Sequence, residues 1–281
     1  MTDATLMTDA ALGREAKRAA PRRPAFKIGA SLGWLVPVLL LVAWQVSAST
    51  GALSSSILPN PLDVIKAAWR LTLSGELLSN VEVSAMRAFA GLIVGGGIGL
   101  AFAFANGLSR WSDGLTDTTL QMVRNVPHLA LIPLVIVWFG IDEGAKLFLV
   151  ALGVFFPIYL NTLHGIRAVD PQLVEMGRSY GMHSRTLFWR IILPGALPSI
   201  FVGLRFALGI TWLTLIVAET IAAQSGIGYM AMQAREFMQL DVVVLAILIY
   251  AVLGKLADSS VRVLERLFLS WNPAYVQTGA R

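Results

Sequence analysis

Residues 165–194 read GIRAVDPQLVEMGRSYGMHSRTLFWRIILP, and they separate two long apolar runs at residues 144–163 and 196–222. Asp170 before Pro171 is a favourable helix start, because the carboxylate accepts hydrogen bonds from free backbone N–H groups and proline has no N–H to satisfy. Gly181 suits the left-handed turn that ends such a helix. The stretch therefore predicts a helix that starts at Pro171 and stops at Gly181.

The second half of this loop predicts another short helix. Ser184 is a suitable N-cap for a helix over residues 185–192, and we expect Pro194 to interrupt that helix before the next apolar run. Two interpretations of the loop are open from the residues alone: it lies on the inner leaflet with its arginines at lipid phosphates, or it docks onto another protein. Three residues of the first helix fall on one face: Leu173, Met176 and Tyr180.

Composition indicates an integral membrane protein. Hydrophobic residues make up 56% of the 281 residues and charged residues 14%, whereas soluble domains carry about a quarter charged residues. The chain has no cysteine, which excludes disulfides, thiolate metal sites and a cysteine nucleophile. A net charge of +5 in such a chain indicates the positive-inside pattern rather than binding to nucleic acid.

Apolar runs of about 20 residues are long enough to cross ~30 Å of hydrocarbon. The sequence therefore predicts an all-α membrane protein with six transmembrane helices, at residues 31–48, 84–106, 118–139, 144–163, 196–222 and 242–261. An alternative for the first run is a cleaved signal peptide, which the long basic tail and the late Trp44 disfavour. Between the first two runs, residues 62–73 predict an amphipathic helix along the outer interface.

The basic residues predict the orientation. Lys and Arg gather in the N-terminal tail, the 165–194 loop and the C-terminal end, while the other side has only Lys66, Arg70, Lys146 and Arg235. Both termini are therefore expected in the cytoplasm. The predicted organisation is a disordered basic cytoplasmic tail (1–30), a transmembrane domain (31–270) containing the 165–194 loop, and a cytoplasmic C-terminal tail (271–281).

Small residues recur at every fourth position of the second run, which favours close packing of helices within the chain over a subunit interface. They are Gly91, Gly95, Gly99, Ala103 and Gly107. The cluster of glycines at 95–99 is not a phosphate loop, since it lacks a following Lys-Ser/Thr, and the chain contains no GxxxxGK[ST] sequence. The three histidines lie on separate segments without metal-ligand spacing, and no catalytic grouping is evident, so we predict neither a metal site nor an enzyme.

Ionisable residues within the apolar runs are candidates for a translocation pathway. Arg124 and Arg205 are the cationic candidates, with His128 one helical turn beyond Arg124, and the alternative is that both arginines reach headgroups or pair with buried carbonyls. Glu219 is expected to act as a gate or structural partner, with Arg235 or Lys146. Asn161 and His164 either line the inner mouth or are polar groups whose hydrogen bonds are satisfied where helices pack.

The loop pattern E-M-G-x3-G-x9-I-x-L-P, from Glu175 to Pro194, resembles the E-A-A-x3-G-x9-I-x-L-P loop of binding-protein-dependent ABC importer permeases. Two positions, Met176 and Gly177, depart from the alanines of that pattern. The resemblance implies the type I importer permease fold, with this loop as the coupling helix seated on a cytoplasmic ATPase. The coupling residues it implies are Asp170, Glu175, Met176, Gly177, Gly181, Ile191, Leu193 and Pro194.

The resemblance extends over most of residues 30–275. Five stretches are similar to the nitrate, taurine and sulfonate branch of these permeases, and most to the aliphatic sulfonate permeases: residues 124–134, 138–142, 218–222, 225–230 and 271–275. This implies the permease subunit of an ATP-driven importer that translocates aliphatic sulfonates across the bacterial inner membrane. Taurine, nitrate or another small anion is the alternative cargo.

The resemblance also implies the partners. These are ATPase subunits that carry the ATP and Mg, a periplasmic substrate-binding protein, a second copy of the chain and membrane lipid, with no cofactor in this chain itself. A different class, a self-contained proton-driven carrier, would need an intramembrane acid relay and usually repeated halves. The sequence shows neither, and the 165–194 loop would have no role in such a carrier.

Overall fold

The computed structural model describes residues 29–50 and 58–272, and no strand occurs among them. The chain divides into two units, residues 1–53 and 54–281. The described part of the first unit is α2 (Gly29–Ser49), whose segment Leu35–Ser49 is apolar but short for a span. The two predicted tails lie almost wholly outside the described residues.

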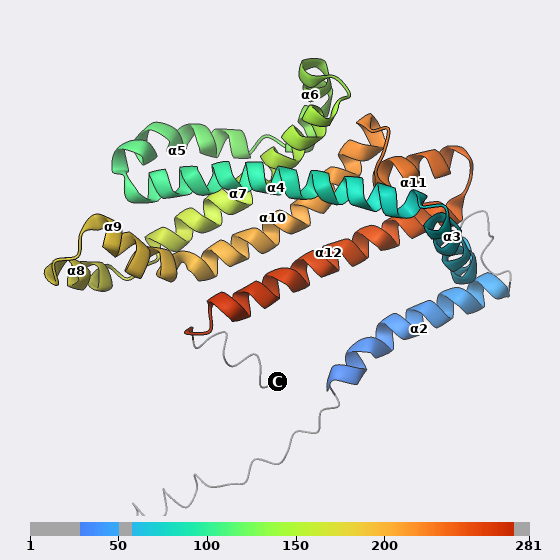
Figure 1. The fold of residues 1–281 in the computed structure, drawn as a ribbon, viewed down its shortest axis with the longest axis horizontal. Helices are drawn as coiled ribbons and strands as arrows, with labels where there is room; N and C mark the ends of the chain where they lie inside the picture. The colour runs from blue at the N-terminus through green and yellow to red at the C-terminus, as the bar shows by residue number, and fades with distance from the viewer. Residues whose placement is uncertain (1–28, 51–57, 273–281) are drawn as a thin grey trace, which may run out of the picture. The chain divides into compact units, whose positions relative to one another are not determined.

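The second unit is a set of helices (Figure 1). In chain order they are α3 (Pro61–Leu73), α4 (Glu76–Leu108), α5 (Arg110–Arg124), the 3₁₀ turn η1 (His128–Leu131), α6 (Ile132–Phe139), α7 (Glu143–Arg167), α8 (Pro171–Ser179), α9 (Ser184–Leu187), the π turn η2 (Phe188–Ile192), α10 (Leu193–Ala222), α11 (Ile227–Glu236) and α12 (Leu240–Phe268).

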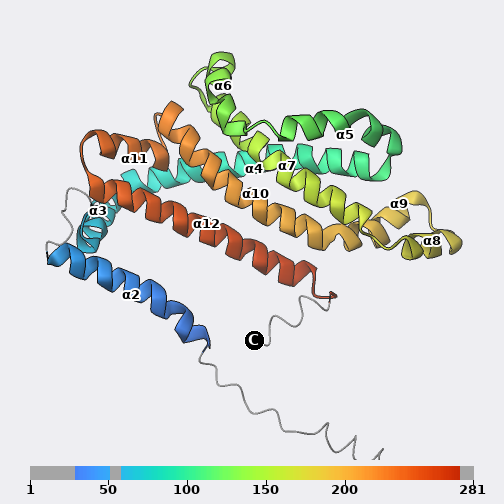
Figure 2. The ribbon, with the colours of Figure 1, turned by 180° about the vertical axis from the view of Figure 1, so that it is seen from behind.

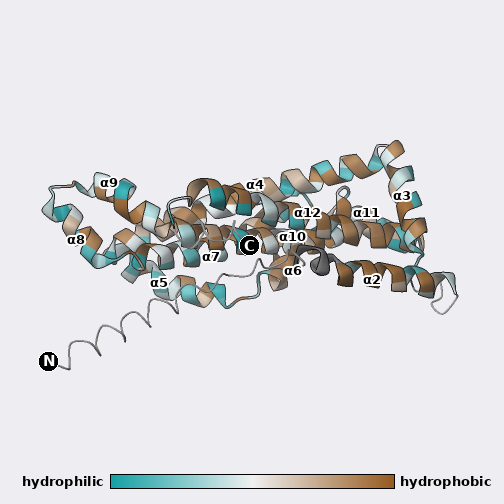
Figure 3. Cartoon of the chain, turned by 90° about the horizontal axis from the view of Figure 1, so that it is seen from below, coloured by the Kyte–Doolittle hydropathy of each residue, from teal (hydrophilic) through white to brown (hydrophobic). Residues whose placement is uncertain are grey.

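Four helices of the described chain are long and apolar enough to cross a membrane: 76–108, 143–167, 184–221 and 240–268. They confirm four of the six predicted spans, and the total of six stays a prediction. Brown, apolar residues dominate these long helices in Figure 3. The predicted helix at 62–73 is confirmed as α3, which buries Val64, Ala67 and Leu71.

The predicted span at 118–139 is not one straight helix, and whether it crosses the membrane stays a prediction. The chain there forms α5 and the η1–α6 segment, which are bent by 81° at a break over residues 125–127. Pro127 explains the break, because a proline disfavours helical geometry in the residue before it, here Val126. Pro133 has no such effect, since it lies in the first turn of α6, where proline is tolerated.

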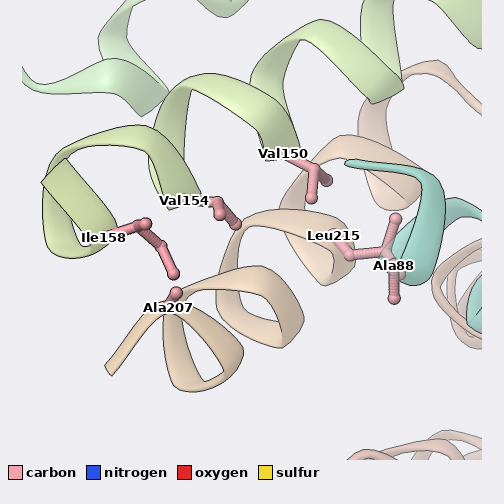
Figure 4. Packing of buried hydrophobic residues seen from close by; sticks show 6 residues of the cluster. All are labelled: Ala88, Val150, Val154, Ile158, Ala207 and Leu215. Atoms are coloured by element: carbon pink, nitrogen blue, oxygen red, sulfur yellow. The ribbon is translucent and has the colours of Figure 1, made fainter. Parts of the chain in front are cut away.

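Helix α7 packs against both α4 and α10, and their buried side chains form the main core. Figure 4 shows these side chains pointing toward one another from the three helices. The cluster consists of Ala88, Val150, Val154, Ile158, Ala207 and Leu215.

The predicted ridge of small residues is the surface of α4 that contacts α7. A Cβ added to Gly99 would lie 2.8 Å from the carbonyl oxygen of Phe155, and one added to Gly107 would lie 2.9 Å from Ile166. At Gly95 the nearest atoms belong to the backbone of Ala151. The ridge therefore serves packing within the chain, as predicted, because only hydrogen atoms fit between the two backbones.

Two neighbouring glycines of α4 allow a matched test of this contact. Gly95→Ala should lower the free energy of unfolding by about 1–3 kcal/mol, the usual cost of overpacking, because the backbone of Ala151 cannot move aside. Gly97→Ala should leave stability unchanged or raise it by up to about 1 kcal/mol through helix propensity, since a Cβ there meets nothing within 4 Å. SDS titration of the purified protein in detergent measures both, and equal stability of the two variants would contradict the packing.

Candidate functional site

The first half of the 165–194 loop folds as predicted. Asp170 caps α8, with its Oδ1 accepting a hydrogen bond from the backbone N–H of Gln172 at 2.8 Å. Gly181 has φ +75°, the left-handed conformation that glycine adopts without strain. The N–H groups of Gly181 and Met182 donate to the carbonyls of Arg178 and Gly177, the Schellman pattern that ends a helix.

The second half differs from the prediction at both ends. Ser184 is the first residue of α9 rather than its cap, and His183 holds the cap position. Pro194 does not interrupt the helix, because residues 184–221 form one continuous helix. The π turn η2 lies just before Pro194. Proline has no N–H and its ring is bulky, and the wider π turn accommodates both without ending the helix.

Helix α8 presents one face outward and one inward. Gly177 is buried, and a Cβ there would lie 2.7 Å from Leu187 and 2.8 Å from Ile191, so only glycine permits this close crossing. The implied coupling residues divide accordingly: Asp170, Glu175, Met176 and Gly181 are exposed, whereas Gly177 is buried and Ile191, Leu193 and Pro194 are half-buried. Leu173 and Tyr180 are exposed beside Met176.

This loop lies at one end of α7 and α10, and the helix α11 lies at the other (Figure 2). Hydrophilic residues are frequent in α8 and α9 (Figure 3). An exposed helix with apolar residues on its free face and a rigid turn at its end has the form of a docking element.

At the α11 end, Glu219 is fully buried in a network of hydrogen bonds. Its carboxylate accepts from Ser84 Oγ and Arg87 Nη1 at 2.8 Å, from the N–H of Gly228 at 2.9 Å and from Tyr250 Oη at 3.0 Å. The prediction that Glu219 pairs with Arg235 or Lys146 is wrong. The ion-pair partner is Arg87, because α4 crosses α10 at this level.

Arg87 extends the network to two more segments. It pairs with Glu143 at 2.6 Å and donates to the carbonyl of Ser225 at 2.6 Å, while Lys146 pairs with the same Glu143 at 3.0 Å. The network thus joins α4, α7, α10, the turn before α11, α11 itself and α12. Arg87 was not predicted as the partner of Glu219. Its position in an apolar run marked it as a candidate, but no sequence pattern indicates a pairing of residues 132 positions apart.

Arg205 lies apart from the other pathway candidates. Its guanidinium pairs with Glu265 at 2.5 Å and with Asp258 at 3.3 Å, both on α12. Asp258 also pairs with Arg262. These contacts favour a structural role for Arg205, through carboxylates rather than through the headgroups or carbonyls expected.

A pocket of about 570 Å³ opens beside the break at 125–127. Arg124 and His128 both line it, although the break means that they do not share a helix face as predicted. His128 Nε2 lies 3.0 Å from Thr214 Oγ1 of α10. Asn161 also lines the pocket and donates to the carbonyl of Pro157 at 2.8 Å, whereas His164 is exposed and outside the pocket.

The remaining pathway candidates, Arg205 and Glu219, do not line this pocket. In the part of the chain that the structure describes, no three His, Cys, Asp or Glu residues are grouped to hold a metal ion.

The family described as "Binding-protein-dependent transport system inner membrane component" matches residues 95–269. The putative aliphatic sulfonates transport permease protein SsuC of Escherichia coli (strain K12) is 62% identical over 242 residues, covering 86% of this chain and 92% of that protein. The protein of the same description from Bacillus subtilis (strain 168) is 44% identical, covering 93% of this chain and 94% of that protein.

A solved structure described as an amino acid ABC transporter with histidines has a similar fold. Its TM-score is 0.58 at 19% sequence identity, and the match covers 71% of this chain and 97% of that one. At that identity the likeness concerns the fold alone, which is that of an ABC importer permease.

The buried network predicts a large difference between two acidic residues that both pair with arginine. Glu219→Gln should lower the free energy of unfolding by about 3–5 kcal/mol, because it leaves buried Arg87 without its buried counter-charge. Asp258→Asn should cost less than about 1 kcal/mol, since that pair is partly exposed. Detergent unfolding curves compare the two, and a similar loss in both variants would argue against the network as the stabilising element.

Proposed function

We propose, since this chain belongs to the family of binding-protein-dependent transport system inner membrane components, that it is the membrane-spanning subunit of an ATP-driven importer of aliphatic sulfonates. The observation that carries the substrate is the 62% identity to a protein described as an aliphatic sulfonates transport permease, over nearly the whole of both chains. The observation that supports an ATP-driven importer is helix α8, which is capped at its start, ends at a glycine and has an exposed face.

Energy enters through the 165–194 loop in this proposal. The exposed residues Glu175, Met176 and Tyr180 contact a separate ATPase subunit, which binds the ATP and Mg, as this chain has no nucleotide-binding sequence. Because α9, η2 and α10 form one continuous helix, a displacement of α8 and α9 is transmitted directly into the membrane domain. The continuous helix replaces the interruption at Pro194 that the sequence predicted.

The assembly is completed by a periplasmic binding protein and a second copy of this chain, with two-fold symmetry. Both termini and the 165–194 loop lie on the cytoplasmic side, and the Glu219 network lies on the opposite side. The described helices support a multi-pass arrangement, in which α5 and η1–α6 together form one broken span.

Transport tests the proposed substrate directly. The complex of this chain with its ATPase and binding protein, reconstituted in liposomes, should take up ethanesulfonate and longer alkanesulfonates only when ATP is present. Taurine and nitrate are the comparison solutes. Uptake driven by a proton gradient without the ATPase would contradict the proposed class, and uptake of taurine or nitrate in place of alkanesulfonates would contradict the proposed cargo.

Two glycines with the same backbone conformation test the docking loop. Gly181 has φ +75° and Gly75, in the turn before α4, has φ +78°, and a Cβ at either position meets nothing within 4 Å. Valine therefore imposes similar strain, about 1–3 kcal/mol, at both positions. Gly181→Val should abolish most ATP-driven uptake and weaken co-purification with the ATPase, while Gly75→Val should retain both. An unchanged Gly181 variant would remove the loop from the coupling mechanism.

A further inference from the structure

We propose that the pocket beside the 125–127 break is a binding site within the membrane domain that holds an alkanesulfonate by its anionic head and its alkyl tail together. The inference rests on the proposed function and adds a selective site in this chain to it. Four observations carry it: an unpaired arginine, the depth of the pocket, polar groups around that arginine, and an apolar wall without acidic residues.

Arg124 has no counter-ion among the described residues. One arginine in each of α4, α10 and α7 is paired within 4 Å: Arg87 with Glu143 and Glu219, Arg205 with Glu265, and Arg167 with Asp113. No carboxylate of the described residues lies within 4 Å of the Arg124 guanidinium. Asp117, two helical turns earlier on α5, instead accepts a hydrogen bond from Gln121 at 2.6 Å. Arg124 is exposed at the pocket, so its guanidinium is available to an anion that enters there.

The pocket extends along α7 from Leu152, near the middle of the helix, to Asn161, six residues before Arg167 at its end. At 1.5 Å per residue, Leu152 is about 22 Å and Asn161 about 9 Å from Arg167 along the helix. A ligand whose tail reaches Leu152 therefore lies deeper in a ~30 Å hydrocarbon layer than a lipid phosphate at its surface. Such a ligand is a solute in transit.

The polar groups of the pocket suit an oxyanion with several oxygens. Arg124 offers planar paired donors. Asn125 and Asn161 also line the pocket, and each amide has a second N–H beyond the one it donates to a backbone carbonyl. His128 is fixed by Thr214, and this contact depends on Gly153, where an added Cβ would lie 3.2 Å from the imidazole Nε2 and 3.1 Å from the Thr214 hydroxyl. The three oxygens of a sulfonate match this set of donors.

The rest of the wall is apolar, and none of the described residues that line the pocket is Asp or Glu. An alkyl tail therefore finds a favourable surface, whereas the ammonium group of taurine finds no counter-charge and nitrate has no tail to bury. The apolar lining includes Leu131, Leu152, Phe156, Leu160, Phe206 and Ile210. The pocket thus selects alkanesulfonates over taurine, which differs from ethanesulfonate by its ammonium group.

Equilibrium binding tests this site separately from transport. The permease–ATPase complex in nanodiscs, without the binding protein, is titrated calorimetrically with 1-pentanesulfonate, ethanesulfonate and taurine. Affinity should rise about fourfold for each methylene buried, from a transfer free energy of ~0.8 kcal/mol per methylene. Taurine should bind at least about tenfold more weakly than ethanesulfonate.

Two arginines at the ends of one helix supply the matched variants. Arg124→Gln should weaken pentanesulfonate binding by about 10- to 100-fold through loss of a charged hydrogen bond, and Arg124→Lys should have an intermediate effect. Arg110→Gln, at the start of α5 and outside the pocket, should bind as the unmodified complex does. Leu152→Phe should reduce the preference for the longer tail, an effect that a purely structural residue would not produce.

The outcomes separate the two proposals. Equal binding by the Arg124→Gln and Arg110→Gln complexes, or equal affinity for taurine and ethanesulfonate, overturns the site even if ATP-driven uptake of alkanesulfonates proceeds. Failure of the unmodified complete complex to take up any alkanesulfonate overturns the proposed function instead. Retained co-purification of each variant with the ATPase shows that loss of binding is not loss of folding.

Discussion

The close approach of α4 to α7 is the constraint on which the rest of the second unit depends. At Gly95 and Gly99 the two helix backbones touch, because no side chain intervenes. This contact uses one face of α7, and α10 covers another. Phe156 and Asn161 of α7 line the pocket, and Asn161 also lies against Gly203 of α10. The position of the pocket is therefore a consequence of helix packing.

Charged residues in the membrane domain have three kinds of surroundings. Arg87 and Glu219 neutralise each other in a buried network that joins six segments. Arg205 pairs with carboxylates of α12 in a partly exposed position. Arg124 has neither arrangement. Since burial of an uncompensated charge is unfavourable, the first two groups act as structural elements, whereas the exposed Arg124 is available to a ligand.

Prolines shape the two places where motion and binding are proposed, with opposite results. Pro127 ends a helix and opens the break beside the pocket, whereas Pro194 lies within a continuous helix after a π turn. Pro157 lies inside α7 and also leaves it continuous. The difference is one of context: before Pro194 the helix already has the wider π turn, while residues 125–127 are exposed.

The sequence by itself determined the class of the protein, four of its long helices, the packing ridge on α4, and the cap and glycine turn of α8, because each depends on residue type and spacing along a single helix. The resemblance in the 165–194 loop identified the family that the comparisons then showed. Only the tertiary structure decided the partner of Glu219, the partners of Arg205 and the pocket. Each of these requires contact between residues far apart in the chain, such as Arg87 with Glu219 and His128 with Thr214, and no local pattern encodes which distant helix lies opposite.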